Sequence, residues 1–113
     1  MTRFNANLLR GTLELLVLRA LAAGPRHGYG ILEWMEQAVS PALLVEEGTL
    51  YPALHRLEDE GWIRAEWGAS ENNRKAKYYH LTRKGVKRVE SESVAFEAYA
   101  DKVLRALRGE ASA

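Results

Sequence analysis

The side chains best suited to bind another molecule are concentrated in residues 47–61, EGTLYPALHRLEDEG. A hydroxyl, a phenol, an imidazole and a guanidinium follow one another here, and each can donate hydrogen bonds to phosphate oxygens or to base edges. The start of a helix also carries partial positive charge, which favours anions. We therefore predict a DNA recognition helix whose outward residues are Thr49, Tyr51, Pro52, His55 and Arg56.

No other group of residues has the types and spacing needed for catalysis. The three histidines, His27, His55 and His80, lack the spacing of a metal-binding pair. Glu33 and Glu36 lie one helical turn apart, but a pair of acids on a helix is usually a solvated surface. The sequence contains neither a nucleophile elbow nor a glycine-rich phosphate loop. It therefore predicts a protein that is not an enzyme and has no metal or cofactor.

The predicted recognition helix also has a face that suits a core. An apolar stripe runs along it at i, i+3, i+4 and i+7, formed by Leu50, Ala53, Leu54 and Leu57. Thr49 is predicted to cap its start, because a threonine hydroxyl can accept a free N–H of the first turn. Gly61 is predicted to end it in a left-handed conformation, with Trp62 packing back against the helix.

Residues 62–81 have the pattern of a β-hairpin. WIRAEW alternates apolar and charged residues, GASENN is typical of a turn, and KAKYYHL is a second strand. Because neighbouring side chains of a strand point to opposite faces, parity with Leu81 makes Tyr79 the inner tyrosine and Tyr78 the outer one. Trp62 and Trp67 are predicted to pack the hairpin against the helices.

Positive charge is concentrated in the same region. From Trp62 to Arg88 eight lysines and arginines accompany two glutamates, a net charge of +6, whereas residues 33–60 carry −6. Such a block is either solvated surface or the electrostatic footprint of nucleic-acid binding, and the adjacent recognition helix favours the second. The hairpin residues predicted to contact DNA are Arg74, Lys75, Lys77 and Tyr78.

The last helix is predicted over residues 83–108, with Thr82 as its cap. Its apolar positions follow a heptad spacing of 3 and 4, and a helix of this length extends beyond a domain this small. The seam needs cover, either from a second copy of the chain or from the first helix of the same subunit, and both can hold together. The seam residues predicted at a dimer interface are Val86, Val89, Phe96, Ala100, Val103 and Leu107.

Two further helices are predicted near the N-terminus, over residues 8–23 and 28–39, the second with an inner stripe that extends to Ala38 and Val39. Three helices followed by a basic hairpin is the order of a winged helix-turn-helix, a mostly α fold with a small β-hairpin. We expect residues 1–82 to form the DNA-binding domain and residues 83–113 the C-terminal dimerisation helix and tail.

Composition sets the remaining expectations. The chain has 113 residues, no cysteine, and a hydrophobic fraction of 47%, which suits one folded domain without disulfides. Charged residues interrupt every apolar run before it could span a bilayer, and the N-terminus lacks a signal-peptide pattern. We expect a cytoplasmic protein that does not bind membranes.

Four segments together resemble the PadR family of transcriptional regulators, in its short form with a single C-terminal helix. They are LLRGTLELLVL at 8–18, HGYGI at 27–31, EGTLYPALHRLEDEGWI at 47–63 and RKAKYYHLTRKG at 74–85. The resemblance implies a winged-helix homodimer that binds an inverted-repeat operator in double-stranded DNA and usually represses. It also implies that Tyr29 touches the DNA backbone and that a small hydrophobic or phenolic effector binds near Trp34, Phe96 and Tyr99.

One alternative remains open from the sequence. Winged helices also serve as adaptors that bind other proteins, and fold alone does not decide between these uses. The positive charge of the hairpin region favours DNA, because an adaptor does not need it.

Overall fold

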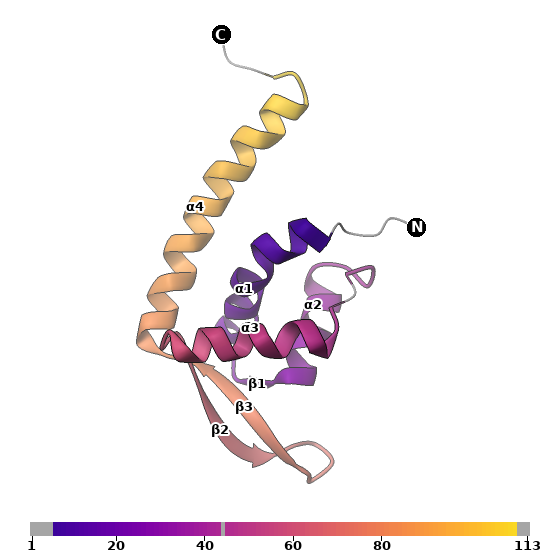
Figure 1. Cartoon of the computed structure of the whole chain (residues 1–113), viewed down its shortest axis with the longest axis vertical. Coiled ribbons are helices and arrows are strands. Elements are labelled where there is room, and N and C mark those ends of the chain that lie inside the picture. Colours follow the sequence, from indigo (N-terminus) through magenta and orange to yellow (C-terminus); the bar gives the residue numbers. More distant parts are fainter. Residues whose placement is uncertain (1–5, 44, 111–113) are drawn as a thin grey trace.

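The computed structural model describes residues 6–43 and 45–110. In chain order the elements are α1 (Ala6–Ala22), β1 (Arg26–His27), α2 (Gly28–Ala38), α3 (Glu47–Asp59), β2 (Ile63–Ala69), β3 (Lys75–Leu81) and α4 (Arg83–Leu107). Helices α1, α2 and α3 lie together, the β2–β3 hairpin projects from them, and α4 extends from the base of the hairpin in the opposite direction (Figure 1). The predicted α+β winged-helix architecture is confirmed.

The sheet has one strand more than the sequence predicts. Its order is β1-β3-β2, with antiparallel pairing throughout. The two residues of β1, Arg26 and His27, pair with Tyr79 and Tyr78. This short strand ties the start of α2 to the hairpin, which two strands alone would leave marginally stable.

The core lies where the helices meet the base of the sheet. All four residues of the predicted α3 stripe are buried, and burying each leucine stabilises the fold by about 1.5–3 kcal/mol. Ile31 and Met35 face them from α2. Ala38 and Val39 are exposed, contrary to the prediction, because α2 ends at Ala38. The other buried apolar residues are Leu13, Val17, Leu18, Ala20, Leu21, Leu43, Ile63, Tyr79 and Val89.

Helix α3 begins earlier than predicted, and Thr49 is not its cap. The capping position belongs to Glu46, whose backbone is extended and whose side chain makes no capping hydrogen bond. Thr49 lies within the first turn and donates its backbone N–H to the Glu46 carbonyl at 3.0 Å. The helix can start at Glu47 because a carboxylate in the first turn favours the positive end of the helix dipole. Pro52 consequently lies inside the helix, where it cannot donate to the Gly48 carbonyl.

The other end of α3 follows the prediction. Gly61 has a φ of 78°, a left-handed conformation that costs glycine little. Its N–H donates to the Glu58 carbonyl, and the N–H of Trp62 donates to the Leu57 carbonyl, each at 3.0 Å. These two bonds form a Schellman motif, which ends the helix and turns the chain into β2.

Thr82 caps α4 as predicted, and it also joins this helix to α3. Its Oγ1 accepts the N–H of Gly85 at 3.0 Å and donates to the Gly61 carbonyl at 2.7 Å. Gly85 lies against the Trp62 carbonyl so closely that a Cβ at this position would collide with it. The start of α4, the end of α3 and the base of the hairpin therefore form one compact junction.

Only the first turns of α4 belong to the core. Val89 is 5% exposed and packs inside its own subunit, so the position predicted for a dimer contact instead covers the chain's own hydrophobic core. Towards its end the helix leaves the domain, and Leu107 is 78% exposed (Figure 1). Seam residues beyond Val89 are half-buried or exposed.

Candidate nucleic-acid interface

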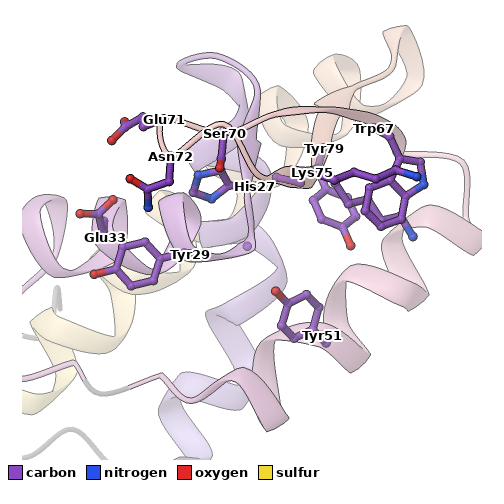
Figure 2. Close-up of a pocket in the computed structure, with 13 residues that line it drawn as sticks. His27, Tyr29, Glu33, Tyr51, Trp67, Ser70, Glu71, Asn72, Lys75 and Tyr79 are labelled. Carbon is purple, nitrogen blue, oxygen red and sulfur yellow. The ribbon is translucent and has the colours of Figure 1, made fainter.

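The side chains of the outward residues of α3 point in three different directions. Tyr51 points toward α2 and the hairpin (Figure 2). Arg56 points the other way, and its Nε lies 3.2 Å from Oε2 of Glu14 on α1. The two positions are five residues apart, about 140° around a helix, so the outer side of α3 does not act as one surface.

Between these directions lies the outermost ridge of α3, which contains Pro52 and His55. Both are exposed, and the His55 imidazole lies 3.7 Å from the carboxylate of Asp59, one turn further along. This ridge projects furthest from the core stripe and is the part of α3 best placed to enter a groove.

Tyr51 lies over the start of α2. Its hydroxyl is so close to Gly28 that a Cβ there would collide with the phenol. Gly28 therefore allows α2 and α3 to approach, which explains a glycine at the start of a helix that it would otherwise destabilise. Tyr29, the next residue, is exposed on the same side.

A concave surface of about 750 Å³ separates the starts of α2 and α3 from the hairpin, and we call it the notch. Figure 2 shows Tyr29 and Tyr51 facing the hairpin residues across it. Its other lining residues are His27, Gly28, Glu33, Trp67, Ser70, Glu71, Asn72, Lys75, Ala76, Lys77 and Tyr79.

Trp67 belongs to the notch, whereas the sequence predicted that it packs the hairpin against the helices. It is 60% exposed. Ala65 pairs with Tyr79 and Trp67 with Lys77, so these four side chains share one face of the hairpin. The inner part of that face meets the core at Tyr79, and the outer part extends past it. Trp62, in contrast, is half-buried against the core, as predicted.

The predicted basic residues of the hairpin differ in their surroundings. Lys75 lies over the Trp67 ring, with its Nζ 5.0 Å from the ring centroid. Lys77 lies 3.9 Å from the carboxylate of Glu58 on α3. Arg74 is exposed at the turn, which Asn73 closes with a φ of 55°.

The two tyrosines of β3 have structural partners. The Tyr78 hydroxyl donates to the Ala69 carbonyl at 3.1 Å, so this phenol braces the hairpin. Tyr79 is buried, as parity predicted. Burial raises the pKa of the Tyr79 phenol, and the nearby groups of Glu58 and Tyr51 raise it further.

His27 has a role that the sequence prediction missed. Its Nδ1 accepts the N–H of Gly30 at 3.0 Å and caps the start of α2. Its ring also lies 5.3 Å from that of Tyr78. The histidine that precedes Gly28 and Gly30 could have indicated a cap, but Ser, Thr, Asp and Asn are the usual capping residues.

A second concave surface, of about 400 Å³, lies between α1 and α4. Phe96 and Tyr99 line it together with Trp62, over which the guanidinium of Arg88 stacks at 4.3 Å. Trp34, the third residue predicted near an effector, is not part of this groove. None of the described helices is long and apolar enough to cross a membrane.

Comparison with known proteins agrees with this geometry. The profile of the transcriptional regulator PadR-like family matches residues 17–91. An uncharacterised protein from Lysinibacillus sphaericus is 31% identical over 80 residues, covering 71% of this chain and 73% of that protein.

Solved structures give the same result. A PadR-like transcriptional regulator from Bacillus cereus superposes with a TM-score of 0.78 at 29% identity, covering 89% of this chain and 96% of that one. For a PadR family transcriptional regulator from Eggerthella lenta the TM-score is 0.76 at 30% identity, with coverages of 90% and 87%. The chain belongs to the PadR-like family of transcriptional regulators, which are DNA-binding proteins and not enzymes.

Proposed function

We propose that this regulator is a homodimeric repressor that binds an inverted-repeat operator. The observation that supports it best is that the start of α3, at Tyr51, and the basic hairpin lie on either side of one notch (Figure 2). In this arrangement α3 enters the major groove and the hairpin tip lies along the neighbouring minor groove.

The proposed contacts keep the predicted residues but give them different tasks. Pro52 and His55, on the outermost ridge, meet base edges, and Tyr51 and Tyr29 lie where the DNA backbone passes. Thr49 and Arg56 flank the groove on the α1 side, with Arg56 paired to Glu14. The hairpin contacts are Arg74, Lys75, Lys77 and Tyr78.

For the dimer, α4 supplies the surface. Its 25 residues are about 37 Å long, and every residue from 101 to 107 is exposed. A two-fold copy would bury this apolar seam. We propose that residues 1–82 bind DNA and residues 83–113 dimerise, with residues 1–5 and 111–113 outside the described structure. The proposed interface residues are Val86, Phe96, Ala100, Val103 and Leu107.

A small hydrophobic or phenolic effector is proposed for the groove between α1 and α4, against Phe96 and Tyr99. Because α1 packs against α3 through the core and through the Glu14–Arg56 ion pair, a ligand there could alter the position of the recognition helix.

The DNA contact of the hairpin can be tested with two matched variants. Lys75 lies on the notch face, whereas Arg64 lies on the opposite face of the same hairpin. We expect Lys75→Ala to weaken binding to every duplex and to reduce the slope of log K against log salt by about one, because one phosphate contact is lost. Arg64→Ala should leave the slope unchanged.

Equilibrium titration of a duplex at several salt concentrations measures both variants. Equal slopes for wild type and Lys75→Ala would contradict the role of the hairpin. If the wild-type protein binds no duplex even at low salt, the alternative of a protein-binding adaptor is favoured.

A further inference from the structure

The exposed indole of Trp67 needs an explanation beyond the fold. It lies on the outer half of the hairpin, past the point where the same face packs at Tyr79. A large aromatic side chain left in water gains little stability from burial, and aromatic residues of this kind are enriched at contacts with other molecules. Its position in the notch indicates which molecule the indole contacts.

The proposed function determines what must pass through the notch. If α3 occupies the major groove and the hairpin tip the adjacent minor groove, the sugar–phosphate strand between the two grooves runs between these elements. The notch is the space between them, and it is bounded by Tyr29 and Tyr51 on the helices and by Trp67 on the hairpin (Figure 2).

The two ends of the notch carry opposite charge. Lys75 lies with Trp67 at one end, and Glu33 and Glu71 lie near Tyr29 at the other (Figure 2). Lys77 pairs with Trp67 across the hairpin, and Glu58, 3.9 Å from its Nζ, partly balances its charge, so Lys75 is the main source of positive charge at the first end. A polyanionic strand is repelled by the acidic end and attracted by the lysines, so it should follow the side that Trp67 lines.

The pair formed by Trp67 and Lys75 matches the chemistry of such a strand. The ammonium group lies over the indole ring at 5.0 Å. Together they present an apolar surface beside a positive charge, which corresponds to a deoxyribose beside its phosphate. The ammonium would bind the phosphate while the ring packs against the sugar.

We propose that Trp67 is a positioning residue for DNA, whose indole packs against the sugar–phosphate backbone of the strand that runs through the notch. This inference rests on the proposed function and adds a residue to it. Because the indole is neutral, its contribution differs from that of the lysines. It should strengthen binding without releasing counterions, so affinity and salt dependence separate.

The first experiment measures binding of a random-sequence DNA duplex at several salt concentrations. We expect Trp67→Ala to weaken binding about tenfold, comparable to the loss of one aromatic contact with a nucleotide, while the salt slope stays that of wild type. Trp67→Phe should recover most of the affinity. Circular dichroism should show that both variants fold, since the side chain is largely exposed.

The second experiment uses the fluorescence of Trp67 itself. Subtracting the emission of Trp67→Phe from that of wild type isolates this residue from Trp34 and Trp62. Adding the duplex should protect the Trp67 signal from quenching by acrylamide.

Two outcomes would overturn the inference while leaving the proposed function intact. The first is that Trp67→Ala binds the duplex with the affinity of wild type. The second is that acrylamide quenches the Trp67 fluorescence equally with and without bound duplex. A wild-type protein that binds no duplex would overturn both proposals.

Discussion

Tyr79 is the residue at which the hydrophobic core and the notch meet. It is buried, yet its phenol lies near Glu58 and Tyr51 at the edge of the proposed DNA surface. Lys77 is also close, with its Nζ 5.7 Å from the Tyr79 ring centroid. Burial of the phenol and the neighbouring acid both favour its neutral form, so the pKa is raised above its ordinary value of 10.0.

This pKa shift gives an expected dependence of stability on pH. Below pH 10 the phenol is neutral in both the folded and the unfolded chain, so its contribution to stability is fully present. As the pH rises above 10, the unfolded chain loses the proton first, and stability falls until the folded pKa is passed. We expect wild type to lose more stability than Tyr79→Phe between pH 9 and 11.

Urea unfolding of both proteins across that range measures the difference. Lysines and the other tyrosines titrate in both proteins, so their contribution cancels in the comparison. Parallel losses in the two proteins would mean that the Tyr79 phenol titrates normally.

At this scale the sequence predicted directions within an element better than contacts between elements. Strand parity correctly predicted that the Tyr79 side chain points inward. Helical spacing grouped Tyr51 with Arg56 because both lie off the apolar stripe, but it could not show that one faces α2 and the other Glu14 of α1. The exposure of Trp67 was also missed, because an alternating strand pattern does not show where the covering helices end.

Among the elements, the junction of α3, the hairpin and α4 is the most constrained. Gly85 lies against the Trp62 carbonyl, a backbone atom that cannot move without shifting β2. We expect Gly85→Ala to lower the free energy of unfolding by about 3 kcal/mol, at the upper end of the cost of overpacking.

A second glycine serves as the control. Gly48 lies in α3 with open space around its Cα. There the substitution Gly48→Ala should stabilise the protein by about 0.5–1 kcal/mol, because alanine favours a helix. Chemical denaturation of both variants compares them, and equal stabilities would show that the contact at Gly85 relaxes without cost.

The elements themselves were largely predictable, and the errors have physical causes. The α3 stripe, the Gly61 end and the Thr82 cap depend on local patterns and were confirmed. The start of α3 was placed three residues late, because Thr49 is a better capping residue than Glu46, whose backbone takes that position. β1 was missed because two residues carry no periodicity, and only pairing with β3 makes them a strand.

For the whole molecule, the overhang of α4 is the main departure from a compact shape (Figure 1). The heptad spacing predicted a long helix that needs cover, and the structure divides the seam at Val89. Val89 packs into the core of the subunit, whereas the exposed apolar residues of the seam on either side of it remain for the proposed partner.

The proposed dimer can be tested at this seam. Phe96→Asp should place a charge in the interface and yield monomers of 12.7 kDa in sedimentation equilibrium. Operator affinity should fall at least a hundredfold, because the two half-sites are then bound separately. Val94→Asp is the matched control, since Val94 is exposed on α4 but lies outside the heptad positions. A Phe96→Asp protein that remains dimeric would move the interface to another surface, such as α1.

The bridging hydroxyl of Thr82 has a consequence for the kind of operator that the dimer would accept. By joining Gly61 to Gly85 it ties the end of α3 to the start of α4, the helix proposed to bind the partner. Two reading helices fixed in this way would keep a constant separation of about one turn of duplex, roughly 34–36 Å. Inserting a base pair between the half-sites would displace and rotate one half-site relative to the other. The dimer would then discriminate between operators of different spacing because the junction between α3 and α4 is stiff.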